Sequence, residues 1–274
     1  MRDWLKILVT LVVVTLIVSA CAPAATPTPT EVPPTEPPAT YLDTIMAKGK
    51  IVVGTSADYP PFEYVDEEGN FAGFDMDVIR EIGKRLGVEV EIVDMAFDTI
   101  IAAVQQGKID CAIAAMSATA ERDEKVDFTI AYYKSADSML VASDSTIEIS
   151  KPEDAAAHNI GVQTGTTHED WVLEVLVETG LMPEDRVFRY ERADQAALDL
   201  EAGRIDVLFV DEAVGKAFEE EMNLKVIFVG YLAQEPDAIA IPEGATELKA
   251  ALDEVITQME EEGVLDELKA LHFE

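Results

Sequence analysis

The sequence predicts an α/β protein with two lobes of similar design and a ligand cleft between them. Short apolar segments typical of strands alternate with segments of helical spacing through most of the 274 residues, an order that favours largely parallel sheets. The pattern occurs twice, because the stretch 203–206 (Gly-Arg-Ile-Asp) repeats 107–110 (Gly-Lys-Ile-Asp), each before an apolar segment. Two such lobes whose strands end in polar groups imply a cleft between them.

The charge balance excludes one class of partner. The chain has 20 basic and 54 acidic residues, for a formal net charge of -34, with 49% hydrophobic residues available for a core. A protein this acidic repels nucleic-acid phosphates, so we expect no nucleic-acid binding. A zwitterionic ligand is still compatible with this charge, because salt screens distant charges within about 10 Å and a site is local.

The N-terminus has the features of a signal peptide over residues 1–20. Arg2 and Lys6 precede an apolar run from Ile7 to Val18, which is shorter than the roughly 20 residues that span a membrane. Small residues then lead into Cys21, which resembles the lipobox of bacterial lipoproteins and implies cleavage before Cys21 and its lipidation. The alternatives are an ordinary signal peptide and a single membrane anchor.

Residues 21–40 form a predicted tether between the lipidated cysteine and the body. This stretch is almost entirely Pro, Thr, Ala and Glu, which favours extended polyproline conformations of about 3.1 Å per residue. The other cysteine, Cys111, has no partner for an intrachain disulfide once Cys21 is lipidated. We interpret Cys111 as a small apolar residue of a buried strand, not as a catalytic thiol.

The first half of the body contains three predicted strands and two predicted helices. The strands are 50–55, 88–93 and 109–114, and the helices follow 73–78 and occupy 97–105. Tyr59 and Phe97 both follow strands, so they are candidates for walls of the cleft. Asp75 and Asp77 open the first helix, where capping and dipole compensation explain them more simply than acid–base chemistry or a metal site.

The segment from Ala114 to Arg122 combines small side chains, hydroxyls and one arginine. Small residues let a ligand approach the backbone, Ser117 offers a hydrogen bond, and the fork of Arg122 matches a carboxylate. A plain strand followed by a surface turn is the alternative for this segment.

The second half repeats the alternation of strands and helices. We expect strands at 159–162, 187–190, 225–229 and 238–242, and helices at 169–178, 193–202 and 247–261, with a shorter helix after Gly263. A small-residue loop joins Gln163 to Thr167. Asp211 ends an apolar run and is either a ligand group or the N-cap of a helix over 212–218.

Four ordered segments resemble the extracellular solute-binding proteins, family 3, of amino-acid ABC transporters. They are 73–78 (Gly-Phe-Asp-Met-Asp-Val), 114–122 followed by 126–128 (Val-Asp-Phe), 161–167 (Gly-Val-Gln-Thr-Gly-Thr-Thr) and 203–211. The resemblance spans nearly the whole body from Lys50 to Phe273, and implies a periplasmic-binding-protein-like fold without a cofactor or metal.

The resemblance implies a role for each matching residue. Arg122 would bind the α-carboxylate of an amino acid and Asp211 its α-ammonium, which agrees with the need to pair both charges of a buried zwitterion. Ser117 and the backbone at Ala115 would share these contacts, and Thr167 would close over the carboxylate. Tyr59 and Phe97 would hold the ligand side chain between them.

Two departures from the family pattern concern ligand specificity. Ser56 stands where members that bind cationic amino acids often carry an acid, which weakens an assignment to lysine, arginine or histidine. Ala115 replaces a common glycine or serine, which removes one possible hydroxyl contact. Gln163 and Met116 are expected to face the ligand side chain. We therefore expect a polar amino acid.

The resemblance also implies the lobes, the partners and the location. Residues 41–136 with 237–274 would form lobe 1 and residues 137–236 lobe 2, with hinges near 134–138 and 233–237. Closure would present a monomeric protein to the permease of an ABC transporter at the extracytoplasmic face of the cell membrane. The alternatives are a dehydratase of the cyclohexadienyl or arogenate type on the same fold and a ligand-sensing subunit. The three histidines, His158, His168 and His272, form no catalytic pattern in the sequence.

Overall fold

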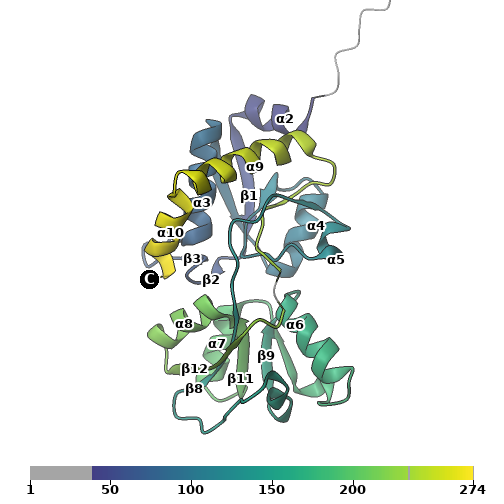
Figure 1. Ribbon diagram of the computed structural model, residues 1–274, viewed down its shortest axis with the longest axis vertical. Helices are drawn as coiled ribbons and strands as arrows, with labels where there is room; N and C mark the ends of the chain where they lie inside the picture. The colour runs from purple at the N-terminus through teal and green to yellow at the C-terminus, as the bar shows by residue number, and fades with distance from the viewer. Residues whose placement is uncertain (1–38, 234, 274) are drawn as a thin grey trace, which may run out of the picture. The chain divides into compact units, whose positions relative to one another are not determined.

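The computed structural model describes residues 39–233 and 235–273, and residues 39–274 form one compact unit (Figure 1). The predicted signal peptide, Cys21 and nearly all of the tether lie outside the described residues. No helix among the described residues is long and apolar enough to cross a membrane.

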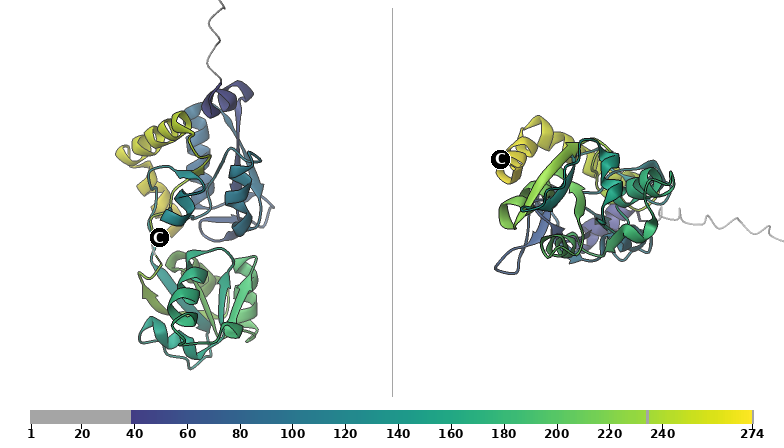
Figure 2. Two further views of the ribbon diagram at one scale, coloured as in Figure 1. Left: turned by 90° about the vertical axis from the view of Figure 1, so that its right-hand side faces the viewer. Right: turned by 90° about the horizontal axis from the view of Figure 1, so that it is seen from below.

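The first of two five-stranded sheets has the order β5-β1-β6-β13-β7. Its strands are β1 (Lys50–Thr55), β5 (Glu89–Asp94), β6 (Cys111–Ala112), β7 (Asp127–Phe128) and β13 (Ala240–Ile241). The helices of this part are α2 (Tyr41–Lys48), α3 (Phe74–Leu86), α4 (Ile100–Gln105), α5 (Ala120–Asp123), α9 (Thr246–Glu261) and α10 (Val264–Phe273), with a 3₁₀ turn η1 (Phe97–Thr99). Helices α3, α9 and α10 lie together on one side of this sheet (Figures 1 and 2).

The second sheet has the order β10-β9-β11-β8-β12. Its strands are β8 (Asp137–Ala142), β9 (Ile160–Gln163), β10 (Val187–Tyr190), β11 (Val207–Asp211) and β12 (Leu224–Gly230). Its helical segments are α6 (Thr167–Trp171), α7 (Ala193–Glu201), α8 (Glu212–Glu221), the 3₁₀ turns η2 (Pro152–Ala157) and η4 (Glu184–Arg186), and the π-helical η3 (Val172–Val177). A small antiparallel sheet of β2 (Asp58–Tyr59), β3 (Glu63–Val65) and β4 (Phe71–Ala72) follows β1.

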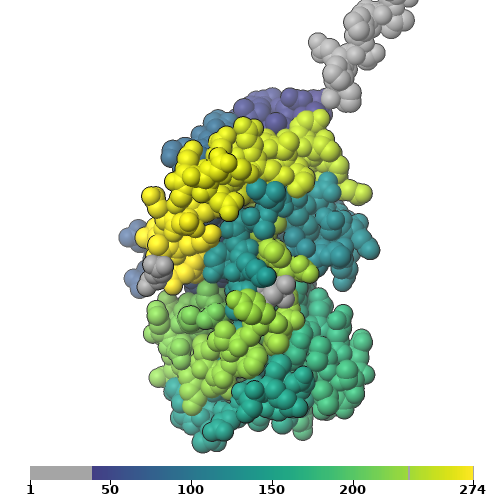
Figure 3. All heavy atoms as spheres, in the orientation of Figure 1, coloured from purple at the N-terminus to yellow at the C-terminus, as the bar shows by residue number. Residues whose placement is uncertain are grey.

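Two chain segments connect the sheets, one between β7 and β8 and the other between β12 and β13. They meet at an antiparallel bridge between Tyr133 and Asp237, and Asp237 also bridges to Ser117. The space-filling view shows these segments between the two parts of the unit (Figure 3). The backbone near Ser117 is therefore attached directly to a connecting segment.

The repeat noticed in the sequence performs the same structural task in both sheets. A side chain at Gly54 would collide with Ile109, and a side chain at Gly161 would collide with Ile205 in the same way. The adjacent aspartates each accept a backbone hydrogen bond at 2.8 Å, Asp110 from Val52 and Asp206 from Asn159. A Cβ at either position would therefore have to displace the end of that isoleucine side chain, which packs directly on the strand.

The structure changes several expectations about local elements. The strand expected over 109–114 is limited to β6. Both sheets are mixed and not largely parallel: β13 runs antiparallel to β6 and β7 in the first sheet, and β8 runs antiparallel to β11 and β12 in the second. The helix expected over 169–178 begins at Thr167 and continues as η3. The capping role predicted for Asp75 is wrong, since Gly73 occupies the N-cap and the Asp75 side chain is fully buried.

Candidate functional site

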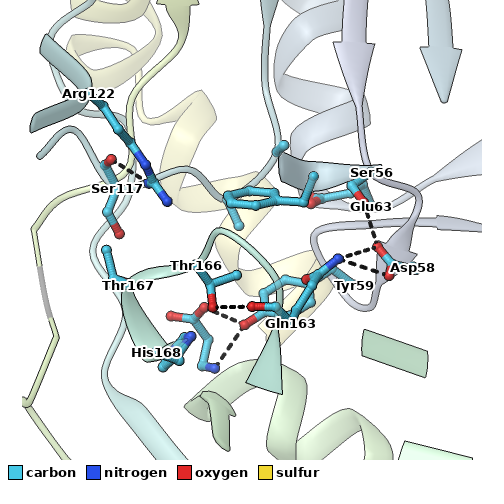
Figure 4. Close-up of a pocket in the computed structure, with 14 residues that line it drawn as sticks. Ser56, Asp58, Tyr59, Glu63, Ser117, Arg122, Gln163, Thr166, Thr167 and His168 are labelled. Carbon is cyan, nitrogen blue, oxygen red and sulfur yellow. Dashed lines mark hydrogen bonds between the residues drawn. The ribbon is translucent and has the colours of Figure 1, made fainter. Parts of the chain in front are cut away.

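A narrow cavity of about 20 Å³ lies where the two sheets face each other at their loop ends (Figure 4). Residues from β1 to β3, the segment between β6 and α5, the loop between β9 and α6 and the end of β11 line it. The lining residues are Ser56, Asp58, Tyr59, Glu63, Phe97, Ala114, Ala115, Ser117, Arg122, Gln163, Thr166, Thr167, His168 and Asp211.

The cavity brings together nine of the ten residues that the sequence nominated for ligand binding. They are Ser56, Tyr59, Phe97, Ala115, Ser117, Arg122, Gln163, Thr167 and Asp211. Met116 is not among the lining residues. Its side chain is 1% exposed and packs with Val126 and Phe128 in an apolar cluster. It therefore points away from the cavity that its neighbours Ala115 and Ser117 line.

Two backbone carbonyls, one before α5 and one in the loop between β9 and α6, hold the Arg122 side chain in the cavity wall. Its Nη1 donates to the carbonyl oxygen of Ser117 at 2.8 Å and its Nη2 to that of Gly165 at 3.0 Å. The guanidinium carbon lies 5.3 Å from the centre of the Phe97 ring, a cation–π distance. Burial lowers the pKa of Arg122, and the fixed fork is ready to bind a carboxylate.

Tyr59 and Asp211 make a pair of hydrogen bonds across the cavity. The Tyr59 hydroxyl donates to Oδ2 of Asp211 at 2.7 Å and accepts from the Asp211 backbone N–H at 3.0 Å. Asp211 does precede α8, but its side chain makes no capping hydrogen bond to that helix. Asp211 instead lines the cavity wall.

Asp58 is a cavity residue that the sequence reasoning missed. Its Oδ1 accepts from the Ser56 hydroxyl at 2.8 Å, and its Oδ2 accepts from the Ala193 backbone at 2.6 Å and from Nε2 of Gln163 at 3.1 Å. Burial raises the pKa of Asp58 to about 6, although these hydrogen bonds oppose the increase. Asp58 lies in the same segment after β1 as Ser56 and Tyr59, and this position is the sequence signal that points to it.

Four further lining residues were also missed. Glu63 is 1% exposed, and burial together with nearby acids raises its pKa well above the ordinary value. His168 lies 3.0 Å from Oδ1 of Asp137; its burial opposes protonation, but this hydrogen bond and the nearby carboxylates raise its pKa. Thr166 caps α6 by accepting from the Glu169 backbone at 3.2 Å, and Ala114 contributes only a small apolar surface.

Within residues 39–233 and 235–273, no group of three or more His, Cys, Asp or Glu side chains is arranged to hold a metal ion. The cavity acids Asp58 and Asp211 instead accept hydrogen bonds from hydroxyl, amide and backbone groups. Such a site suits a small polar ligand that brings its own charges and hydrogen-bond donors.

The comparisons with known proteins agree with this geometry. The model of the bacterial extracellular solute-binding proteins, family 3, matches residues 51–274. The arginine-binding extracellular protein ArtP of Bacillus subtilis is 31% identical over 229 residues, which are 82% of this chain and 87% of ArtP. The structure of an ancestral arginine-binding protein bound to arginine is similar at a TM-score of 0.76 and 34% identity, over 82% of this chain and 99% of that one.

A second similar structure has a connection to an enzyme. The ancestral amino acid-binding protein AncCDT-1, described as a precursor of cyclohexadienyl dehydratase, has a TM-score of 0.76 and 33% identity over 85% of this chain and 99% of that one. It too is an amino acid-binding protein. With a family match that covers most of its length, the chain belongs to the bacterial extracellular solute-binding proteins, family 3.

Proposed function

We propose that the protein binds a single amino acid with a basic side chain in this cavity and delivers it to the permease of an ABC transporter. The observation that carries the proposal is the placement of charge. Arg122 and Asp58 lie at opposite sides of the cavity in Figure 4. A cation at one end and an anion at the other match a ligand with a carboxylate at one end and a positive charge at the other.

The α-carboxylate would bind at the Arg122 end. The guanidinium provides a bidentate fork, and the hydroxyls of Ser117 and Thr167 line the same cavity. Because Arg122 is only 7% exposed, a carboxylate there would meet a cation with little competition from water. This geometry supports the role that the resemblance implied for Arg122.

The α-ammonium would bind beside Asp211. Its carboxylate already accepts one hydrogen bond from Tyr59, and a carboxylate has lone pairs for further donors. An ammonium group would supply such donors together with the compensating charge. Ala115, whose backbone lies in the same wall, is the expected second partner.

The side chain would extend toward Asp58 and Gln163. Ser56 in place of an acid led us to expect a ligand without a positive side chain. Asp58, two residues later, nevertheless places a buried carboxylate in the cavity and accepts a hydrogen bond from the Ser56 hydroxyl. A buried acid with a raised pKa gains most from a cationic partner. The names of ArtP and of the ancestral protein, both arginine-binding, support the same ligand class.

The two lobes and the hinge motion are part of the proposal. Residues 41–136 with 237–274 would move against residues 137–236, since each group contains one of the five-stranded sheets. Binding to one lobe followed by contacts from the other would favour the closed state. The closed state would then be the form that the permease recognises.

The proposal includes anchoring at the extracytoplasmic face of the cell membrane through a lipid on Cys21. Support comes from the lipobox-like sequence and the Pro- and Thr-rich tether. A single acyl chain binds membranes weakly, so durable anchoring needs more than one chain. Metabolic labelling with a fatty acid, lost in Cys21→Ala, would test it.

A dehydratase activity on the same fold is the second candidate. Glu63 favours it, because a buried carboxyl with a raised pKa at the cavity wall is suited to act as a general acid. We propose binding without catalysis, since ArtP and the two ancestral proteins are all binding proteins. Turnover of a prephenate-like cyclic acid by the purified protein, lost in Glu63→Gln, would favour the enzyme.

A thermal-shift panel of the twenty amino acids tests the proposal. A ligand at a hundred times its dissociation constant adds about 2.7 kcal/mol to the free energy of unfolding. We expect the largest shifts from arginine and lysine, and their loss in Asp211→Ala. Shifts from neutral amino acids alone would contradict the basic ligand, and no shift from any of the twenty would contradict amino-acid binding.

A further inference from the structure

We propose that Asp75 is a positioning residue for ligand binding, because it fixes the backbone turn at Ala115 that forms one wall of the cavity. This inference rests on the proposed function of the cavity, and it gives Asp75 a role other than the capping role expected from the sequence. Asp75 does not line the cavity. It acts through the residue that does.

The turn at Ala115 has an unusual backbone conformation. Among the described residues, Ala115 is the one non-glycine residue with a positive φ, at 43°. Alanine disfavours this left-handed region because its Cβ approaches the following carbonyl oxygen, so the surroundings must hold it there. Ala114, Ala115 and Ser117 all line the cavity, so the conformation of this turn sets the shape of that wall.

Asp75 provides the interaction that holds the turn. Its Oδ2 accepts a hydrogen bond from the Ala115 backbone N–H at 2.7 Å and another from the Tyr132 hydroxyl at 2.9 Å. Asp75 is the second residue of α3, where the helix dipole stabilises a negative charge. The side chain is fully buried, so no water competes for the Ala115 N–H.

Glu63 links this arrangement to the cavity. Its side chain lines the cavity, and burial together with the neighbouring Asp75 carboxyl raises its pKa. Oε2 of Glu63 and Oδ1 of Asp75 are both buried without a hydrogen-bond partner within the described part of the chain. A proton shared between the two carboxyls would give each of these atoms a partner. One carboxyl thus faces the ligand while its neighbour holds the turn.

Glycine at position 115 distinguishes positioning from simple support of the fold. Glycine adopts positive φ without the steric penalty of alanine, so it needs less help from Asp75. If Asp75 acts by holding the turn, Asp75→Ala, which removes the acceptor oxygens, should weaken binding strongly in the native background and much less in the Ala115→Gly background. If Asp75 only supports the core, the two losses should be equal.

The test uses four purified full-length proteins, namely wild type, Asp75→Ala, Ala115→Gly and the double variant, with L-arginine as the titrant in calorimetry. We expect Asp75→Ala to weaken arginine binding at least about tenfold, and the double variant to lose less than about threefold relative to Ala115→Gly. Asp77→Ala is the matched control, because Asp77 is in the same turn of α3 but its side chain is 34% exposed and pairs with Arg80 and His272. It should bind arginine as the wild type does.

A second readout does not need a ligand. Hydrogen exchange of the Ala115 amide, measured by NMR in the ligand-free protein, should be at least about tenfold faster in Asp75→Ala than in wild type and unchanged in Asp77→Ala. If Asp75→Ala does not fold, Tyr132→Phe replaces it in both measurements, since it removes the other donor to Oδ2 of Asp75 and should increase exchange at Ala115 severalfold.

The outcomes separate this inference from the proposed function. Equal binding losses in the two backgrounds, or an unchanged Ala115 exchange rate, would overturn the role of Asp75 while leaving amino-acid binding intact. A wild type that binds no arginine but shows the predicted exchange would support the role of Asp75 and contradict the proposed ligand. Faster exchange together with rescue by Ala115→Gly supports both.

Discussion

The hydroxyl of Tyr59 lies 2.7 Å from Oδ2 of Asp211, and these two residues are 152 positions apart in the sequence. Tyr59 belongs to the small sheet after β1, and Asp211 ends β11 of the second sheet. The same hydroxyl also accepts from the Asp211 backbone N–H. The pair joins the two parts of the molecule at the point where we place the ligand ammonium.

Tyr59→Phe removes both hydrogen bonds and keeps the ring. We expect a loss of about 1–2 kcal/mol in the free energy of unfolding, because a buried N–H and a carboxylate lose a partner. Urea denaturation measures it. Tyr64→Phe is the control, since the Tyr64 hydroxyl makes no hydrogen bond to the described residues, and it should cost less than about 0.5 kcal/mol. Equal effects of the two substitutions would contradict the prediction.

Arg122→Ala should weaken arginine binding by about 100-fold, or about 2.7 kcal/mol, because the ligand carboxylate loses its cationic partner. Agmatine, which is arginine without its carboxylate, should bind the wild type weakly, and it should bind Arg122→Ala with about the same affinity. Isothermal calorimetry compares them. Arg204→Ala is the control, because the Arg204 side chain is 69% exposed. A loss of agmatine affinity as large as that of arginine would count against this role.

Gly165→Ala should weaken ligand binding, and Gly180→Ala should not. Both glycines have a left-handed backbone, with φ of 79° and 77°, so both substitutions should reduce stability by about 1 kcal/mol. A Cβ at Gly165 would also lie 2.9 Å from Cβ of Asp98, whereas one at Gly180 meets nothing within 4 Å. Thermal denaturation and arginine titration of both variants separate backbone strain from the contact with Asp98.

Arginine affinity should fall as the pH drops below about 6. Burial raises the pKa of Asp58 to about 6 in the ligand-free protein, and a protonated Asp58 cannot pair with a cation. At pH 5 the affinity should be about tenfold lower than at pH 8. Asp58→Asn should flatten the profile. Titration across this range measures it, and a wild-type profile independent of pH would exclude Asp58 as the partner.

The same pKa makes a prediction for stability with the opposite sign. Because Asp58 holds its proton more tightly when folded than when unfolded, the ligand-free protein loses stability as the pH rises from about 4 to about 6. Asp75, with its pKa raised to about 7 by burial, extends this loss toward neutral pH. Urea denaturation should therefore find ligand-free protein more stable at pH 5 than at pH 7.

The sequence predicted the order of elements well, because apolar periodicity and the repeated Gly-x-Ile-Asp segment are local signals. The strand β8 was missed, since its first residues fell in the predicted hinge 134–138 and its pairing with β11 and β12 is a contact between distant segments. Strands were expected close to β12 and β13, but their antiparallel pairing was not predicted for the same reason. It arises where the chain crosses between the two sheets.

The cavity residues were predictable where a family motif places them and less so elsewhere. Arg122 and Asp211 stood out as charges at the ends of apolar runs. Asp58 and Asp75 did not, because their roles depend on burial and on partners such as Ala193 and Ala115 that are distant in the sequence. Met116 was misplaced because the sequence does not reveal the left-handed turn at Ala115.

The direct test of the central claim is a comparison of L-arginine with L-citrulline, its neutral analogue of nearly the same shape, by calorimetry on wild type and Asp58→Asn. We predict that wild type prefers arginine by at least about 30-fold, or about 2 kcal/mol, and that Asp58→Asn removes most of this preference. Asp194→Asn, an acid outside the cavity lining, should keep it. A preference that survives unchanged in Asp58→Asn, or a wild type that binds citrulline as tightly as arginine, would contradict the account.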